Sequence, residues 1–188
     1  CHDHLRIAAY RQADFQGLFV VSRNSFIRTD VKFPAIGEKV LATPLEFSSV
    51  FDPASRSTGP RVPGREEITI ARFDKDQEWL TPPDPKTSFP GIPRFRPLEA
   101  LARDLPTDGT PTFATNIVNR LWFVMLGRGL IEPLDQIHPD NPPSHPEIAR
   151  LLADEMMARK FDIKEILRAI ASSEAYQRAS QRPATADE

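Results

Sequence analysis

Apolar side chains recur at helical spacing through the second half of the chain. They form one stripe between residues 111 and 127, a second between 146 and 160, and a third between 163 and 171. Spacings of three and four residues place side chains on one face of a helix, so three amphipathic helices are predicted. Their short connections predict that they pack as antiparallel neighbours. A shorter pattern predicts a further helix over 98–105.

Two of these helices begin at patterns typical of a capping box. In this motif a hydroxyl or carboxylate and a glutamate satisfy the first backbone amides of the helix reciprocally. Ser144 and Glu147 form the first pattern, and Asp162 and Glu165 form the second. We therefore expect Ser144 and Glu147 to have a structural role at a helix start.

The first half of the chain is less regular. Residues 14–24 have helical spacing with Asp14 as the N-cap, whereas alternating apolar positions favour strands over 39–47 and 66–73. The chain contains 19 prolines, and 18 of them lie between residues 34 and 146. Because proline lacks a backbone N–H and fixes φ, this stretch cannot be a continuous helix or a central sheet.

These patterns predict a mainly α fold, in which a C-terminal antiparallel helical unit follows a Pro-rich irregular middle with minor β structure. The predicted domains are residues 1–50, a connector with short strands at 51–94, and a helical domain at 95–188. A hydrophobic content of 40% is sufficient for a real core.

The charge of the chain is nearly balanced. There are 24 basic and 26 acidic residues, which give a net charge of −2 and a pI of about 6.1. This balance gives no electrostatic reason to expect a nucleic-acid or anionic-membrane surface. No apolar run approaches the roughly 20 residues needed to span a bilayer, so no membrane span is expected.

The chain begins with Cys1-His2-Asp3-His4 and has no initiator Met. We therefore expect an interior fragment of a longer protein, cut through a Cys-x-x-Cys-His site of which Cys1 and His2 remain. In the complete motif both thiols form thioether bonds with a haem, and the His binds its iron. Because the first Cys is missing, a haem c of the parent is not expected to be attached normally to this chain.

Other interpretations of these residues stay open. Cys1, His2 and His4 are also suitable ligands for zinc or another metal, and an exposed terminus without a ligand role is a further alternative. A second candidate metal site consists of His138, Asp140 and His145. This second site suggests a rival function, a metal-dependent hydrolase-type enzyme acting on an extracellular polymer such as a polysaccharide.

Polar groups also lie on the helix predicted over 111–127. Asn116, Asn119 and Arg120 are three and four residues apart, so their side chains lie near one another. Such groups bind a carboxylate or a sugar, or they satisfy backbone carbonyls and tie a loop to the helix. We expect the structural role here. Trp122 is expected to be a core anchor whose indole N–H is satisfied.

Several motifs resemble one known family. The C-terminal motifs are NIVNRLW at 116–122, GRGLIEPLD at 127–135, DNPPSHPE at 140–147, FDIK at 161–164 and AYQR at 175–178. Together they resemble the planctomycete-specific domain (PSD), a domain of unknown function in large proteins of Planctomycetes and related bacteria. The run from Cys1 to His4, with QADF at 12–15, resembles the end of the PSCyt domain that precedes it. The chain is thus similar to a PSCyt–PSD pair truncated at both ends.

This resemblance implies an exported parent protein, located in the periplasm or at the cell surface, with a cytochrome c-like module upstream and an association with haem. The function that it favours is a cytochrome-associated, redox-linked scaffold or interaction module. The alternatives are the metal-dependent enzyme and a purely structural interaction domain. The expected partners are the missing N- and C-terminal parts of the same protein and the cytochrome c-like module, and not nucleic acid. The family supplies no catalytic residues for this chain.

Overall fold

The structure, a computed structural model, describes residues 3–49, 52–107 and 111–178. It divides into two compact units, residues 1–105 and 106–188, here called unit 1 and unit 2. Each unit has a hydrophobic core of its own. The predicted domain boundaries at residues 50 and 94 stay a prediction. None of the helices in the described ranges is long and apolar enough to cross a bilayer.

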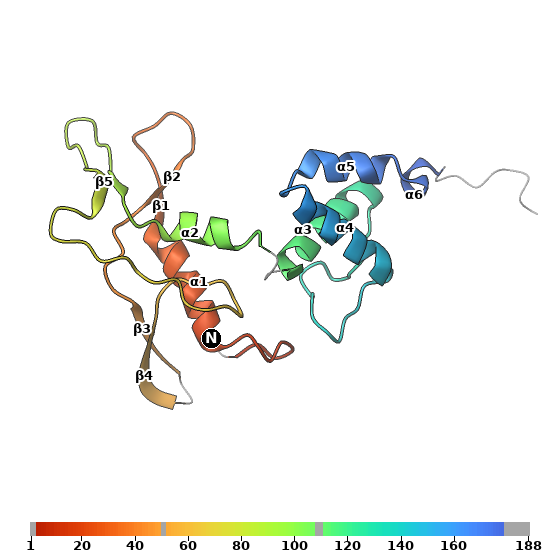
Figure 1. Cartoon of the computed structure of the whole chain (residues 1–188), viewed down its shortest axis with the longest axis horizontal. Helices are drawn as coiled ribbons and strands as arrows, with labels where there is room; N and C mark the ends of the chain where they lie inside the picture. The colour runs from red at the N-terminus through yellow and green to blue at the C-terminus, as the bar shows by residue number, and fades with distance from the viewer. Residues whose placement is uncertain (1–2, 50–51, 108–110, 179–188) are drawn as a thin grey trace, which may run out of the picture. The chain divides into compact units, whose positions relative to one another are not determined.

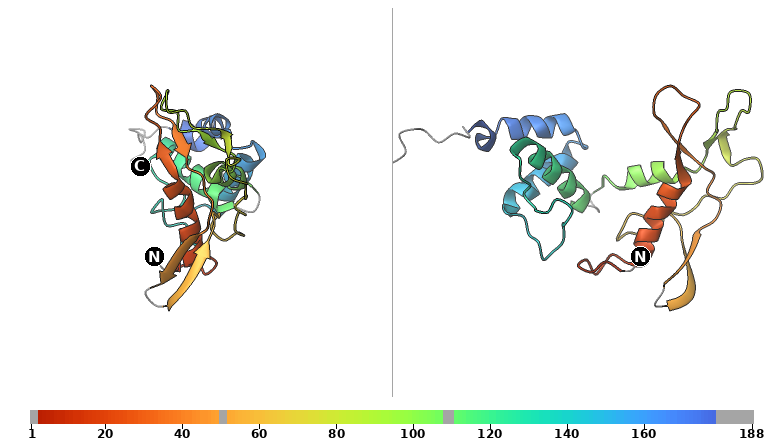
Figure 2. Two further views of the ribbon diagram at one scale, coloured as in Figure 1. Left: turned by 90° about the vertical axis from the view of Figure 1, so that its left-hand side faces the viewer. Right: turned by 180° about the vertical axis from the view of Figure 1, so that it is seen from behind.

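Unit 1 combines helices with small antiparallel sheets (Figures 1 and 2). Its helices are α1 (Gln12–Asn24) and α2 (Pro97–Asp104). Each sheet of its described residues has two strands: β1 (Ser25–Ile27) with β2 (Ile36–Glu38), β3 (Leu45–Ser49) with β4 (Asp52–Thr58), and β5 (Trp79–Thr81) with β6 (Ile92–Pro93). Val21 of α1 is buried against Val62 and Leu101, and this contact joins α1 to α2.

The expected mainly α fold is wrong, because the structure is 37% helical and 15% strand. The strand predicted over 39–47 is present only at its end, as part of β3. No strand forms over 66–73 within the described residues beyond an isolated bridge at Glu67. Instead β4 occupies residues 52–58, where apolar alternation predicts no strand. Its residues are mostly polar, and it pairs with β3 through main-chain hydrogen bonds that hydrophobic alternation does not reveal.

A side chain from β2 caps α2. The N-cap residue Arg96 makes no side-chain capping bond, and Glu38 Oε2 accepts a hydrogen bond of 2.7 Å from the backbone N–H of Leu98 instead. This bond satisfies one of the amides that a helix start leaves without a partner, and it ties the β1–β2 hairpin to α2. Burial raises the pKa of Glu38 above its ordinary value, although the bond from Leu98 and the nearby Arg96 act in the opposite direction.

Glu38→Gln should therefore be at least as stable as the wild type at pH 7. A glutamate whose pKa is raised on folding contributes stability below its unfolded pKa, and that contribution is lost as the pH rises through the folded pKa. Glutamine keeps an oxygen acceptor for Leu98 and cannot ionise. The stability of Glu38→Gln relative to the wild type should thus increase from about pH 4 to pH 7. Glu38→Ala should lose about 1 kcal/mol with the cap. Urea unfolding at several pH values measures both, and parallel pH curves for wild type and Glu38→Gln would contradict the expectation.

Unit 2 is helical in its described residues. Its elements are α3 (Pro111–Leu126), α4 (Pro146–Ala158), α5 (Ile163–Ala171) and the short α6 (Glu174–Gln177). The helices predicted over 98–105, 111–127, 146–160 and 163–171 are thereby confirmed to within two residues. The core is built from one face of each long helix, and its buried side chains include Val118 of α3, Leu152 and Met156 of α4, and Ile166 and Ile170 of α5.

The two predicted capping boxes have different outcomes. Asp162 caps α5, because its Oδ1 accepts hydrogen bonds from the backbone N–H groups of Lys164 and Glu165. At α4 the expected box of Ser144 and Glu147 does not form. The N-cap is His145, which makes no side-chain capping bond, and the Ser144 hydroxyl donates to the carbonyl of Leu130 at 3.1 Å instead. Pro146 starts α4 with a fixed φ and has no N–H that needs a cap.

Candidate functional site

The segment that follows Cys1 and His2 is held against the start of α1. Asp3 Oδ1 accepts a hydrogen bond of 2.8 Å from the backbone N–H of Gln12, and its Oδ2 accepts one of 3.1 Å from the Arg11 guanidinium. These two interactions, the backbone bond first, hold the pKa of the Asp3 carboxyl below its ordinary value. Asp3 thus satisfies the amide of the first residue of α1, which begins at Gln12 with Arg11 as its N-cap residue, and the predicted N-cap Asp14 lies at the third position of the helix.

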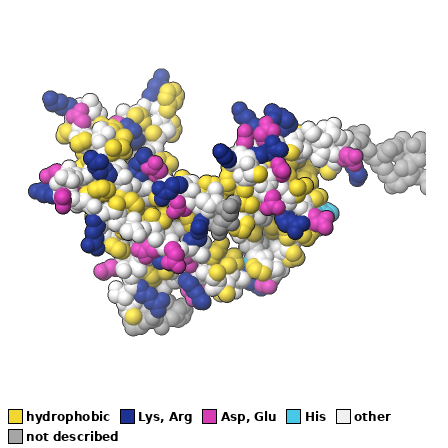
Figure 3. Space-filling view, in the orientation of Figure 1, with side chains coloured by type: hydrophobic (Ala, Val, Ile, Leu, Met, Phe, Trp, Pro, Cys, Tyr) yellow, Lys and Arg dark blue, Asp and Glu magenta, His cyan; other side chains and the backbone are white. Residues whose placement is uncertain are grey.

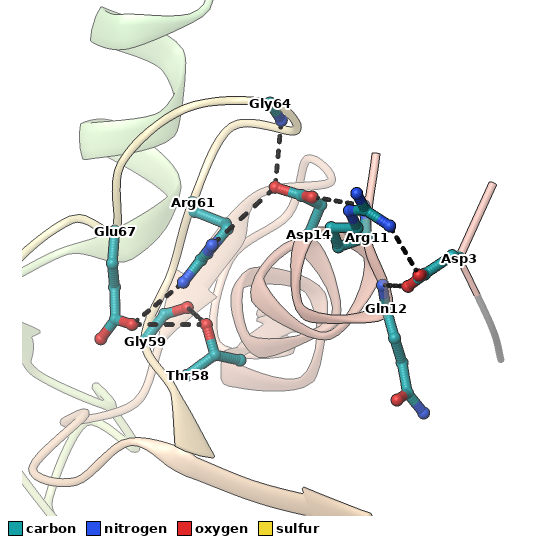
Figure 4. A network of polar contacts seen from close by, with 9 residues as sticks. All are labelled: Asp3, Arg11, Gln12, Asp14, Thr58, Gly59, Arg61, Gly64 and Glu67. Atoms are coloured by element: carbon teal, nitrogen blue, oxygen red, sulfur yellow. Dashed lines mark hydrogen bonds and ion pairs between the residues drawn. The ribbon is translucent and has the colours of Figure 1, made fainter. Parts of the chain in front are cut away.

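Asp14 instead lies in the first turn of α1, where its side chain is only 6% exposed. Its Oδ2 accepts a hydrogen bond of 2.7 Å from the backbone N–H of Arg11, and its Oδ1 accepts one of 3.0 Å from the N–H of Gly64. The guanidinium of Arg61 lies 3.9 Å from the same Oδ1. Figure 4 shows the carboxylate between these groups. Asp14 therefore joins α1 to the loop after β4.

Arg61 continues this network on the other side of α1. The aliphatic part of the Arg61 side chain packs against α1 at Gly17. A Cβ at Gly17 would lie 2.4 Å from Cγ of Arg61, so any larger residue at this position would displace Arg61. The guanidinium reaches Glu67 Oε2 at 3.2 Å, and Thr58 Oγ1 lies 3.5 Å from the same oxygen (Figure 4). Within the described residues, Nε of Arg61 is buried without a hydrogen-bond partner. The network positions three chain segments and offers no evident nucleophile.

The predicted cofactor residues Cys1 and His2 lie outside the described residues. His4 is placed in a turn in which its Nδ1 accepts hydrogen bonds from the backbone N–H groups of Arg6 and Ile7, at 3.1 and 3.0 Å. Its ring packs edge-on against Tyr10. Only Nε2 of His4 is then left for a metal, so the turn restricts the role of His4 in the predicted site.

The other predicted metal ligands lie in the loop before α4. His138 Nδ1 accepts a hydrogen bond of 3.2 Å from the backbone N–H of Asp140 and lies 4.0 Å from the Asp140 carboxylate. His145 is the N-cap residue of α4. In the parts of the chain that the structure describes, no group of three or more His, Cys, Asp and Glu side chains is arranged to hold a metal ion. The metal site at His138, Asp140 and His145 stays a prediction.

The polar residues of α3 divide into two sets. Asn119 is buried, and its amide donates to the carbonyl of Ile131 and accepts from the N–H of Ile131, both at 2.9 Å. It therefore ties the loop after α3 to the helix. The second set is Asn116 and Arg120, which lie on the surface. Arg120 Nε donates a hydrogen bond of 3.0 Å to Asn116 Oδ1. The three side chains do not form one site.

Trp122 lies at the edge of the unit 2 core, half-buried, and lines an apolar groove between α4 and α5. The groove has a volume of about 470 Å³. Its lining includes Trp122 of α3, Ile148 and Leu151 of α4, Ala169 of α5, and Ala175 of α6. Leu151 is 61% exposed there.

The spacing of residues along the chain predicts neither the groove nor the role of Arg61. Ile148 and Leu151 belong to the apolar stripe between residues 146 and 160, which predicts a helix that packs against its neighbours. The width of this apolar stripe was a signal for the groove. The stripe covers a wider part of the helix surface than the face of α4 that is buried, and its members include Ile148, Leu151, Leu152 and Met156. No sequence signal indicated that Arg61 contacts α1, because the contact joins residues far apart in the chain.

No curated protein and no solved structure matches this chain. The C-terminal part does match a family, as the motifs in that part indicated. Residues 98–188, which run from α2 through the helical unit, match PSD1, described as "Protein of unknown function (DUF1553)", so this part of the chain carries a domain of that family.

Proposed function

We propose that the chain is a scaffold or interaction module whose helical unit binds an amphipathic helix of a partner protein. The observation that carries this proposal is the apolar groove between α4 and α5. Exposed leucine and isoleucine side chains that line a concave surface are typical of a site that another apolar surface covers. The PSD1 match neither supplies nor excludes an activity for this surface.

The form of the groove favours a helix as its occupant. The lining residues along α4 and its C-cap run from Ile148 to Arg159, which corresponds to about 16 Å, or three turns, at 1.5 Å per residue. Small side chains at Ala169, Ser173 and Ala175 form the opposite wall and allow close approach. An amphipathic helix places an apolar residue at every third or fourth position, which matches a groove of this length.

The wider context of the proposal comes from the resemblance of the first residues. In an exported, cytochrome-linked parent outside the cytoplasm, Cys1 and His2 would hold a haem c, which would supply electron transfer. The hydrogen bonds that Asp3 accepts from Arg11 and Gln12 fix the backbone that follows these two residues. The helix that the groove accepts would then belong to the same parent or to its cytochrome c-like module, and unit 2 would serve as a redox-linked scaffold.

Leu151→Asp should weaken the binding of a model helix to the groove. A suitable probe is a fluorescein-labelled peptide of about 15 residues that contains only Leu, Glu and Lys, with Leu in a stripe at every third or fourth position. Because burial of a leucine contributes about 1.5–3 kcal/mol, the substitution should weaken binding at least about tenfold. Fluorescence anisotropy measures the affinity.

Val124→Asp is the matched control, because Val124 is 73% exposed on α3 and does not line the groove. It should bind the peptide as the wild type does. A peptide of the same composition with a scrambled stripe should not bind. The proposal fails if the two peptides bind equally, or if both substitutions have the same effect.

A further inference from the structure

The tip of the β1–β2 hairpin exposes an unusual concentration of apolar side chains. Phe33 at the tip is 75% exposed, and Val31 beside it is also exposed. Below them Ile27 and Ile36 face each other in the strand register, and both side chains are open to solvent. Side chains this exposed contribute nothing to the core of unit 1. Exposed apolar side chains that lie together are typical of a surface that another apolar surface covers.

The charged groups at this end of unit 1 are arranged asymmetrically. In the β1–β2 hairpin, the carboxylate of Asp30 is almost buried and pairs with Arg28. In the neighbouring loop between β5 and β6, Asp84 accepts hydrogen bonds of 2.9 Å from the backbone N–H of Lys86 and from the Thr87 hydroxyl. Lys32 and Lys86 are exposed. At each tip, internal bonds therefore engage the carboxylate, whereas a lysine faces solvent.

The two tips lie at the same end of unit 1. Both loops project in the same direction in Figures 1 and 2, and in Figure 3 Lys and Arg side chains stand outermost on both projections beside hydrophobic ones. The hairpins are in contact below their tips, where the guanidinium of Arg28 lies 5.3 Å from the ring centre of Phe89. The acidic residues Asp74 and Asp76 lie in the turn before β5, at the opposite end of that strand from the tip.

We propose that these twin tips bind the surface of an anionic lipid bilayer. Phe33 and Val31 enter the interface between headgroups and acyl chains, and Lys32 and Lys86 contact anionic headgroups. Aromatic and aliphatic side chains flanked by lysines suit this boundary, because each lysine keeps its ammonium group at the headgroup level. Two narrow projections that share an end also suit a broad, deformable surface better than a concave protein site. The balanced net charge of the chain does not reveal this local arrangement.

Co-sedimentation with lipid vesicles tests the proposal. The wild-type chain should bind vesicles of phosphatidylcholine mixed with phosphatidylglycerol, and it should bind much less to vesicles of phosphatidylcholine alone. Phe33→Asp should lower the partition coefficient about tenfold, as expected from the loss of one buried aromatic side chain. Lys32→Glu with Lys86→Glu should remove the preference for the anionic lipid. Leu5→Asp, at an 86% exposed apolar position of the N-terminal segment, is the matched control and should bind as the wild type does.

Phe33→Trp gives an independent readout, since the emission of a tryptophan that enters the interface shifts to shorter wavelength. The proposal is overturned if the wild type binds neither vesicle, if both vesicles are bound equally, or if Phe33→Asp and Leu5→Asp behave alike. It is also overturned if the wild type ignores lipid but forms a dimer that Phe33→Asp dissociates, because the tips would then be an interface between copies of the chain.

Discussion

Asn119→Ala should destabilise unit 2 by about 2–4 kcal/mol. Asn119 is 1% exposed, and its amide pairs with both the N–H and the C=O of Ile131, at 2.9 Å each. The substitution leaves a buried donor and a buried acceptor of the Ile131 backbone without partners, and each such loss costs about 1–3 kcal/mol. Urea unfolding followed by circular dichroism measures the loss, and fluorescence in a Trp79→Phe background reports on Trp122 of unit 2.

Asn116→Ala is the control for this substitution, because Asn116 lies one turn away on the same helix and its side chain accepts a hydrogen bond from the surface residue Arg120. It should change stability by no more than about 0.5 kcal/mol. Asn119→Asp separates shape from hydrogen bonding: a carboxylate still accepts from the N–H of Ile131, but it faces the Ile131 carbonyl without a proton to donate. It should be nearly as destabilising at pH 7 as alanine. Equal stabilities of Asn119→Ala and Asn116→Ala would show that the bidentate contact contributes little.

Asp14→Ala should destabilise unit 1 by about 2–4 kcal/mol. The carboxylate accepts buried hydrogen bonds from the N–H groups of Arg11 and Gly64 and lies beside Arg61. Its removal leaves two amides without an acceptor, and Arg61 then has Glu67 alone as its acidic neighbour in this network. Asp14→Asn should also be destabilising, because one amide oxygen replaces two acceptors and the new NH₂ group points at a donor.

Hydrogen exchange gives a local test of the same contact. The amide of Gly64 should exchange faster in Asp14→Ala, since its acceptor is lost. Asp74→Ala, at an exposed acidic position of unit 1, should leave both the exchange rate of Gly64 and the free energy of unfolding nearly unchanged. Unchanged exchange at Gly64 in Asp14→Ala would mean that Asp14 does not hold the loop after β4.

The sequence by itself determined the helices of the second half. Their apolar spacing and the cap at Asp162 depend on residues within one or two turns of each other, so no knowledge of the rest of the chain was needed. The motifs of this half also indicated a domain of unknown function, and the PSD1 match over residues 98–188 confirms its presence.

Local patterns failed where a distant group competed for the same atoms. Ser144 and Asp162 stand in similar capping patterns, but the hydroxyl of Ser144 donates to Leu130, fourteen residues earlier. Asp14 was expected to be the N-cap residue of α1, yet it lies at the third position of the helix, where it accepts hydrogen bonds from Arg11 and from the distant Gly64. A short motif does not show which of two groups forms the hydrogen bond, because the competing bond forms only when the chain has folded.

Tertiary structure alone decided the β content and the surfaces proposed for binding. The pairing of β3 with β4 depends on main-chain bonds between segments that have no matching apolar alternation, which is why a mainly α fold was expected. Whether an apolar residue is buried also depends on what packs over it: Leu152 of α4 is in the core, and its neighbour Leu151 lines an open groove. Sequence spacing placed both on one helix, and only the packing of α3 and α5 separated the structural residue from the exposed one.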